Sequence, residues 1–168
     1  MELKNYIRDV ENFPIDWIVF KDITPLLQNV KAFNETIERL SVFVKNCDVI
    51  VWLDARWFLF AWALSYKLNK PLTIVRKSGK LPYETISVDY ELEYWKSSFD
   101  MHIDAIKPWQ KVAIIDDLLA TWWTALAACQ LVEKLWWIVD SLNFVVDLTF
   151  LDWKKKLNNY KINSILEY

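Results

Sequence analysis

The chain has one glycine, Gly79, and eleven tryptophans among its 168 residues. Average usage of about 7% predicts roughly twelve glycines in a chain of this length. Glycine adopts a left-handed backbone conformation without strain, so tight turns and helix ends usually contain it. A fold with many such turns must therefore place other residues at positions that favour glycine.

Charge, cysteine content and histidine content limit the possible partners. The net charge is −2, from 20 basic and 22 acidic residues, which leaves no excess positive charge to hold a nucleic acid. Cys47 and Cys129 form no CxxC pair and His102 is the single histidine, which argues against a zinc cluster or a disulfide framework and suits a reducing cytoplasm. The N-terminal residues are charged, and no stretch approaches the ~20 apolar residues of a membrane span. We expect one cytoplasmic domain that binds neither nucleic acid nor membrane.

Apolar runs alternate with amphipathic segments along the chain. Helical periodicity is present in residues 34–46 and again after Thr124. Alternation of this kind predicts an α/β fold in which helices flank a parallel sheet. The runs that we interpret as buried strands are VIVWL from Val49, LTIV from Leu72, VAIID from Val112 and LNFVVDL from Leu142.

A different period marks the region between Leu72 and Val112. Apolar residues alternate with polar ones from Ile86 to Tyr94, and again from Phe99 to Ile103. This predicts a β-hairpin with its turn near Tyr94-Trp95-Lys96. Either a flap over an active site or an ordinary solvent-facing hairpin would have this pattern.

Residues 116–124, DDLLATWWT, combine an acidic pair with hydroxyl residues before a predicted helix. Free backbone N–H groups and the positive end of the helix dipole converge at a helix N-terminus, so such a segment can cradle a phosphate. The two carboxylates would face ribose hydroxyls. The alternative is structural: Asp116 and Asp117 end a strand, and Thr121 or Thr124 caps the helix.

Several motifs, in the same order along the chain, resemble those of the adenine phosphoribosyltransferase family. DDLLATWWT is similar to the family's phosphoribosyl-pyrophosphate (PRPP) loop, DDLLATGGT, with both glycines replaced. FPIDWIVFKDITPLL, residues 13–27, resembles the hood segment, although Ile15-Asp16 departs from the family pattern. LDARWFLF, residues 53–60, resembles the pyrophosphate-side loop. RKSGKLP from Arg76 and LEYWK from Leu92 resemble the flap region.

The resemblance implies a type I phosphoribosyltransferase fold, α/β with a parallel sheet flanked by helices, an N-terminal hood and a β-hairpin flap. It implies a single domain over residues 1–168, with the hood at about 1–30 and the flap at about 80–104. The implied enzyme is a pentosyltransferase of purine salvage that converts adenine and PRPP into AMP and pyrophosphate. Mg²⁺ would be carried with PRPP rather than held by assigned protein ligands, and the enzyme would be a homodimer.

The resemblance also implies the site residues. Catalytic roles fall to Glu93, which would manage the proton of the base, to Tyr94 and to Arg56. PRPP would be bound by an acidic pair, a phosphate loop and a group of cations: Asp116, Asp117, Ala120, Thr121, Trp122, Trp123, Thr124, Arg76, Lys77 and Lys80. Adenine would be bound by Val19, Phe20, Lys21 and Leu118. Taken singly, the cations could be solvated surface charges, Glu93 an outward-facing hairpin residue and Phe20 a core residue.

Two alternatives stay open at this point. The chain could transfer the phosphoribosyl group to another base, such as hypoxanthine or xanthine. It could instead be a regulator that senses PRPP without catalysis, but a regulator is expected to carry a DNA-binding segment or a basic face, which this chain lacks.

Nearly all the tryptophans align with glycines of the family pattern, and several occupy positions that favour glycine on physical grounds. Trp109 follows Pro108 where a type II turn requires a positive φ, and Trp17 and Trp153 each follow an aspartate in a predicted tight turn. Trp136 lies where a left-handed residue would end a helix. The full set is Trp17, Trp52, Trp57, Trp62, Trp95, Trp109, Trp122, Trp123, Trp136, Trp137 and Trp153.

Four interpretations of the tryptophans compete: an aromatic binding surface, core residues, deliberate or random substitution, and UGA codons that the host reads as glycine. The positions follow no helix or strand period, and most fall at turns, which favours the codon hypothesis. A non-glycine residue in the left-handed region costs about 1–2 kcal/mol, and total stability is about 5–15 kcal/mol. We therefore expect the chain as written to fold poorly and to be inactive.

Overall fold

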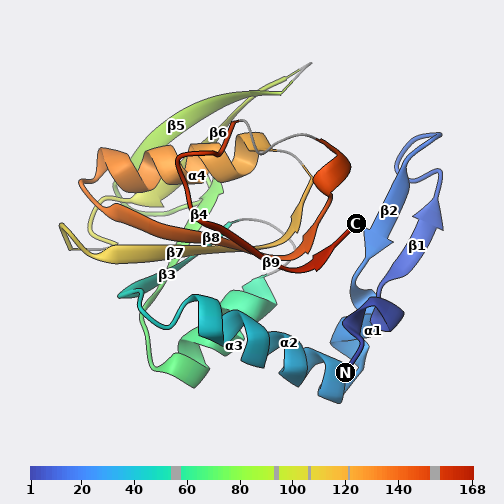
Figure 1. Ribbon diagram of the computed structural model, residues 1–168. Coiled ribbons are helices and arrows are strands. Elements are labelled where there is room, and N and C mark those ends of the chain that lie inside the picture. The colour runs from blue at the N-terminus through green and yellow to red at the C-terminus, as the bar shows by residue number, and fades with distance from the viewer. Residues whose placement is uncertain (54–57, 93–94, 106, 121, 152–155) are drawn as a thin grey trace. The chain divides into compact units, whose positions relative to one another are not determined.

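The structure is a computed structural model that describes residues 1–168 except 54–57, 93–94, 106, 121 and 152–155 (Figure 1). The chain divides into two compact units, Met1–Arg39 and Leu40–Tyr168. The expected assignment of residues 1–168 to one domain, with its hood and flap limits, stays a prediction.

The first unit is built around a small antiparallel hairpin. Strands β1 and β2 pair from Arg8↔Asp22 to Glu11↔Val19. The side chain of Asn29 accepts hydrogen bonds from the N–H groups of Lys31 and Ala32, which caps the following helix. The elements are η1 (Leu3–Tyr6), β1 (Arg8–Glu11), β2 (Val19–Asp22), α1 (Thr24–Gln28) and α2 (Val30–Phe43), whose last turn belongs to the second unit.

The second unit contains a seven-stranded sheet with the order β5-β6-β4-β3-β7-β8-β9. Strands β4, β3, β7, β8 and β9 are parallel, and β5 and β6 extend the sheet as an antiparallel hairpin. The elements are β3 (Val49–Leu53), α3 (Phe58–Leu68), β4 (Leu72–Lys77), β5 (Thr85–Leu92), β6 (Trp95–His102), β7 (Lys111–Leu119), α4 (Trp122–Lys134), β8 (Ile138–Asp147), η2 (Thr149–Leu151) and β9 (Ile162–Glu167).

Both faces of β3, β7 and β8 are largely buried, which explains why these strands contain continuous apolar runs. Val49 and Val51 belong to a core cluster with residues of α4, whereas Ile50, between them in β3, points to the other face and is also fully buried. Helix α4 covers one face and α3 covers the other (Figure 1). The predicted α/β fold, a mostly parallel sheet flanked by helices, is confirmed.

Some boundaries differ from the sequence expectations. β7 does not end at the acidic pair but continues to Leu119, because β8 runs beside it and supplies main-chain partners as far as Leu119↔Asp147. Helix α4 begins at Trp122 rather than after Thr124, so the phosphate loop is shorter than expected. Helix α3 was not predicted, because its sequence, FLFAWALSYKL, is apolar on most sides and shows no single stripe.

The predicted hairpin is confirmed as β5 and β6, which pair from Thr85↔His102 to Leu92↔Trp95. Trp95 and Lys96 are strand residues rather than turn residues, which corrects the expected turn. Residues 93 and 94 lie outside the described part of the chain. Within that part, no helix combines the length and apolar character needed to cross a membrane.

Three tryptophans have the left-handed backbone conformation expected at glycine positions. The φ angles are 75° at Trp17, 70° at Trp109 and 62° at Trp136. The N–H of Ile18 donates to the carbonyl of Ile15 at 3.4 Å, and the N–H of Gln110 donates to the carbonyl of Lys107 at 3.4 Å, which closes the two predicted turns. The third predicted turn, Asp152-Trp153, lies outside the described residues.

The end of helix α4 is a Schellman motif. The N–H of Trp136 donates to the carbonyl of Glu133 at 2.9 Å, and that of Trp137 donates to the carbonyl of Val132 at 3.3 Å. Trp136 is 73% exposed, but Trp137 is only 4% exposed and belongs to the core cluster. The expectation that the tryptophans are not core residues is therefore wrong for Trp137, because the residue after a left-handed cap turns back onto the helix.

Candidate active site

The parallel strands place a ligand site at their carboxyl edge. After β3 the chain forms β4 on one side of β3, and it later returns to form β7 on the other side. Ligands of open α/β sheets bind at such a switch point, beyond the carboxyl ends of the strands. Asp116, Asp117 and the start of α4 follow from β7 at this edge, and Arg76 and Lys77 end β4 at the same edge.

The acidic pair lies in the last part of β7. Both residues are half-buried, and the N–H of Asp117 donates to Oδ1 of Asp116 at 2.9 Å. Burial raises the pKa of the Asp116 carboxyl well above its ordinary value, and the neighbouring charge of Asp117 raises it further. Leu118 is the predicted contact for the second face of adenine. It follows the acidic pair in the sequence and is half-buried.

Asp116→Asn is expected to raise the free energy of unfolding at neutral pH, because it removes a charge that burial and the neighbouring Asp117 disfavour. A carboxyl whose pKa is raised by folding stabilises the protein below the unfolded pKa and loses that contribution as the pH rises through the folded pKa. The difference between variant and parent should therefore be absent near pH 3 and grow as the pH rises. Denaturant unfolding across this pH range measures it, and equal stability of the two proteins at pH 7 would contradict the assignment.

The segment after the acidic pair leads directly into α4. Ala120 follows β7 and Trp122 is the first residue of the helix, so the backbone N–H groups of Trp122 and Trp123 lie in its first turn. Predicted phosphate-binding residues are therefore found at a helix N-terminus. Thr121 lies outside the described residues.

The side chains of Trp122 and Trp123 occupy space at this helix start. Their rings stack with centroids 3.4 Å apart, and Nζ of Lys156 lies 5.4 Å from the ring of Trp122. Both tryptophans line a cavity of about 240 Å³ together with Asp89 and Tyr90 of β5. Two indoles are thus present at a helix N-terminus, where a bound phosphate would need to come close to the backbone N–H groups.

The predicted cations lie where β4 ends and in the turn that follows it. Arg76 is half-buried, and Lys77 and Lys80 are exposed. Nη1 of Arg76 donates to the carbonyl of Lys80 at 3.5 Å, which draws the two ends of the turn together. Gly79, between them, has a φ of 77° and no atom within 4 Å of a Cβ built on it, so its backbone conformation rather than space favours glycine there.

Asp100 of β6 was not predicted as a site residue, although it holds this turn. It is 4% exposed and accepts hydrogen bonds from the N–H of Gly79 at 2.9 Å and from the hydroxyl of Ser87 at 2.7 Å. Although burial raises the pKa of this carboxyl, hydrogen bonds from Ser87, Gly79 and Ser78 outweigh burial and lower the pKa overall. The one sequence signal for Asp100 is its place between Phe99 and Met101, in a predicted strand where apolar and polar residues alternate.

The hood residues predicted to bind adenine belong to β2 in the first unit, whereas Leu118 belongs to the second. Val19 is 45% exposed, and Phe20 packs edge-on against Phe13 with ring centroids 5.3 Å apart. Nζ of Lys21 forms an ion pair with Asp9 at 2.7 Å. The predicted catalytic residues Glu93, Tyr94 and Arg56 all lie outside the described residues.

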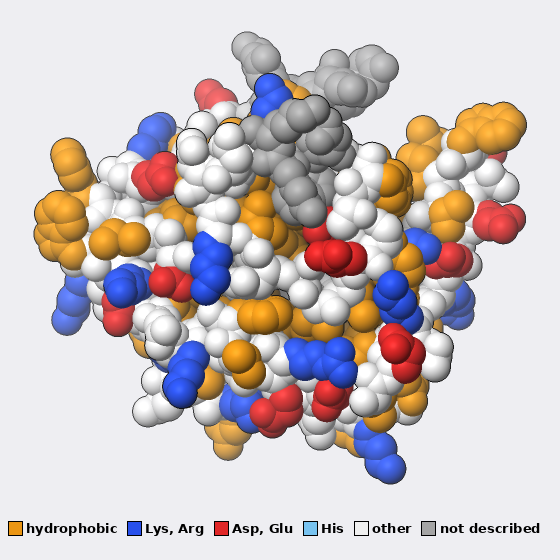
Figure 2. All heavy atoms as spheres, viewed as in Figure 1, with side chains coloured by type: hydrophobic (Ala, Val, Ile, Leu, Met, Phe, Trp, Pro, Cys, Tyr) orange, Lys and Arg blue, Asp and Glu red, His pale blue; other side chains and the backbone are white. Residues whose placement is uncertain are grey.

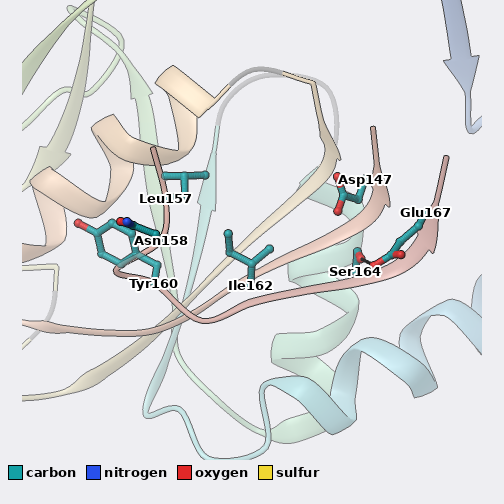
Figure 3. Close-up of a pocket in the computed structure, with 7 residues that line it drawn as sticks. All are labelled: Asp147, Leu157, Asn158, Tyr160, Ile162, Ser164 and Glu167. Carbon is teal, nitrogen blue, oxygen red and sulfur yellow. Dashed lines mark hydrogen bonds between the residues drawn. The ribbon is translucent and has the colours of Figure 1, made fainter. Parts of the chain in front are cut away.

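The rest of the described surface has mixed charge (Figure 2) and contains a further cavity. On the face drawn in Figure 2, basic and acidic side chains are interspersed. A cavity of about 300 Å³ beside β9 is lined by none of the predicted residues that the structure describes. It includes the carboxylates of Asp147 and Glu167, with Ser164 beside Glu167 (Figure 3). No three potential metal ligands cluster anywhere in the described chain.

Comparison with known proteins decides the family. No protein-family model matches the chain. An adenine phosphoribosyltransferase of Methanococcus maripaludis strain S2 is 48% identical over 170 residues, which cover 100% of this chain and 99% of the relative. The chain belongs to the adenine phosphoribosyltransferase family.

Solved structures of family members have the same fold as this chain. A crystal structure of adenine phosphoribosyltransferase from Thermoanaerobacter pseudethanolicus has a TM-score of 0.94 and 48% identity, with 99% of this chain and 98% of the other covered. The enzyme from Saccharomyces cerevisiae, in complex with an imino-altritol bisphosphate and adenine, has a TM-score of 0.94 at 36% identity, with 98% and 97% covered. The type I phosphoribosyltransferase fold expected from the sequence is thereby confirmed.

Proposed function

We propose that the chain, with glycine at its tryptophan positions, transfers the phosphoribosyl group of PRPP to adenine and releases AMP and pyrophosphate. The observation that carries this proposal is the full-length similarity to adenine phosphoribosyltransferases, joined to an acidic pair and a helix N-terminus at the sheet's switch point. Adenine and a bisphosphate bound to the yeast relative support a base and a phosphorylated sugar as ligands.

The distance between the predicted cations and the acidic pair at the carboxyl edge of the sheet suits PRPP. Strand β3 separates β4 from β7, so the cations and the acidic pair are about two strand spacings apart, roughly 10 Å. In our proposal Asp116 and Asp117 hold the ribose hydroxyls, and the N-terminus of α4 with Ala120, Thr121 and Thr124 binds the 5′-phosphate. Arg56, Arg76, Lys77 and Lys80 neutralise the pyrophosphate as the bond to the ribose carbon breaks.

Mg²⁺ fits this arrangement as a companion of PRPP. Magnesium is usually held by one or two carboxylates together with substrate phosphates, and Asp116 and Asp117 supply two carboxylates at the end of β7. When bound, the ion would add positive charge at the leaving pyrophosphate. Glu93, with Tyr94 next to it in the sequence, would manage the proton of the base, and Leu118 would contact one face of its ring.

Base competition tests the reaction. The chain with eleven glycines should form AMP from PRPP and adenine in the presence of Mg²⁺, and equal concentrations of hypoxanthine or xanthine should not slow it. Removal of Mg²⁺ by a chelator should reduce the rate at least about tenfold. Binding of PRPP without turnover of any base would favour the regulator alternative instead.

We also propose a homodimer. Leu59 and Tyr66 lie on one face of α3 and are 41% and 92% exposed, while Phe60 and Leu64 on the opposite face are buried. An apolar face of this kind suits a second copy of the chain. The cytoplasm is the proposed location, because Cys47 and Cys129 are both free thiols.

Tyr66→Asp is expected to convert the dimer into a monomer, because it places a charge in an apolar interface. Sedimentation velocity measures the change. Val42→Asp introduces the same charge at a 71% exposed position of α2 and serves as the control that should leave the dimer intact. A parent chain that sediments as a monomer would contradict the proposal.

Finally, we propose that glycine is the native residue at the tryptophan positions, encoded by UGA codons. The left-handed φ angles of Trp17, Trp109 and Trp136 support this, since three turns in different parts of the chain have the conformation that glycine adopts most readily. Exposures of 94%, 71% and 73% mean that these indoles gain little from packing.

A further inference from the structure

Asp100 connects the turn that follows β4 to the base of the β5–β6 hairpin. In the sheet it lies opposite Arg76 of β4 on one side and opposite Ser87 of β5 on the other. Its Oδ2 accepts from the N–H of Gly79 and its Oδ1 accepts from the hydroxyl of Ser87. One carboxylate therefore links three consecutive segments of the chain.

A buried carboxylate is well suited to fix this turn. Hydrogen bonds to an ionised acceptor are shorter and about twice as strong as neutral ones. Gly79 has a left-handed φ of 77°, and in this conformation its N–H donates to Oδ2 of Asp100. The adjacent N–H, that of Ser78, donates to the carbonyl of Ser98 at 3.0 Å, so two successive backbone groups of the turn are held on β6.

The residues beside these anchors are the cations of the proposed site. Lys77 precedes the anchored pair and Lys80 follows it, and both are exposed. Long lysine side chains are flexible, so the backbone must be fixed if their ammonium groups are to meet one leaving group. Asp100 itself is 4% exposed and cannot contact a ligand in solution directly.

We propose that Asp100 is a positioning residue for pyrophosphate recognition: it holds the Ser78-Gly79 turn so that Lys77 and Lys80 face the leaving group of PRPP. This inference rests on the proposed function for its substrate, but the anchoring itself does not. Asp100→Asn keeps the size of the side chain but places an amide donor against either Gly79 N–H or Ser87 hydroxyl, so the three-segment link is lost.

Two measurements test the proposal in the full-length chain, as written and with glycine at the eleven tryptophan positions. In Asp100→Asn the Gly79 amide should exchange with deuterium at least about tenfold faster, because it loses a charge-assisted hydrogen bond. In the glycine-containing chain the same variant should raise the KM for PRPP about tenfold and leave the KM for adenine unchanged. Ser87→Ala, which removes one donor and keeps the carboxylate, should have a smaller effect on both.

Asp104→Asn is the matched control, since Asp104 is an exposed acid four residues after Asp100, beyond the end of β6. It makes the same charge change and should alter neither measurement. Unchanged Gly79 exchange in Asp100→Asn, or equal rises in the KM for both substrates, would overturn the positioning role. If the proposed function is wrong, the parent chain with Asp100 intact forms no AMP. In that case the exchange rate of the Gly79 amide still shows whether Asp100 anchors the turn.

Discussion

Glycine in place of Trp17, Trp109 and Trp136 is expected to raise the free energy of unfolding by about 3–6 kcal/mol. Each of these residues has a positive φ, between 62° and 75°. An L-residue with a side chain loses about 1–2 kcal/mol in this region, and glycine does not. Since the three indoles are largely exposed, their removal leaves no cavity to offset the gain.

Denaturant unfolding of the single, double and triple variants measures this gain, and thermal unfolding should show a rise on the order of 10 °C. The gains at Trp109 and Trp136 need not add, because the N–H of Trp109 donates to the carbonyl of Trp136 at 3.2 Å.

Alanine at the same three positions is the control for side-chain removal. It should recover little of the stability, because alanine retains a Cβ. Trp62→Gly is the control for glycine itself: Trp62 lies inside α3, where glycine should cost about 0.5–1 kcal/mol. If alanine stabilises as much as glycine, left-handed strain is not the cause.

The second large effect is expected at Trp122 and Trp123. Glycine at both positions, introduced into a chain already stabilised at the three turns, should raise the rate of AMP formation at least about 100-fold. The stacked indoles occupy the start of α4, where backbone N–H groups must come within hydrogen-bonding distance of a phosphate. Loss of these contacts with the non-reacting 5′-phosphate misplaces the ribose, and a misplacement of about 1 Å can cost about 10² in rate.

Steady-state assays with PRPP and adenine provide the measurement, and the stabilised parent that retains Trp122 and Trp123 is the reference. Trp62→Gly in that parent should not restore activity, because Trp62 lies on α3, away from the phosphate loop. An equal rate of AMP formation in the reference and in the glycine variant would mean that the indoles do not obstruct the site.

Local patterns in the sequence predicted much of this fold. Strands β3, β4, β7 and β8 were recognisable because burial on both faces makes them continuous apolar runs. The β5–β6 hairpin was recognisable from its period of two. The turns at Trp17 and Trp109 could be predicted because an aspartate or a proline precedes each of them.

Features that depend on tertiary contacts could not be predicted in this way. The edge strand β9 carries a mixed polar sequence, INSILE, and is ordered by pairing with β8. Trp137 looked like a turn residue, but the Schellman motif returns it to the core. Asp100 is one acid among many in the sequence, and only the register of β6 between β4 and β5 brings it to Gly79 and Ser87.

We propose that glycine, not tryptophan, is the native residue at these positions. Trypsin should release residues 112–134 of the protein isolated from its own cells as one peptide, since that segment is bounded by Lys111 and Lys134 and has no internal lysine or arginine before its last residue. Fragment-ion mass spectrometry of this peptide identifies residues 122 and 123 directly. We expect glycine at both positions, and tryptophan at both would rule out glycine as the native residue.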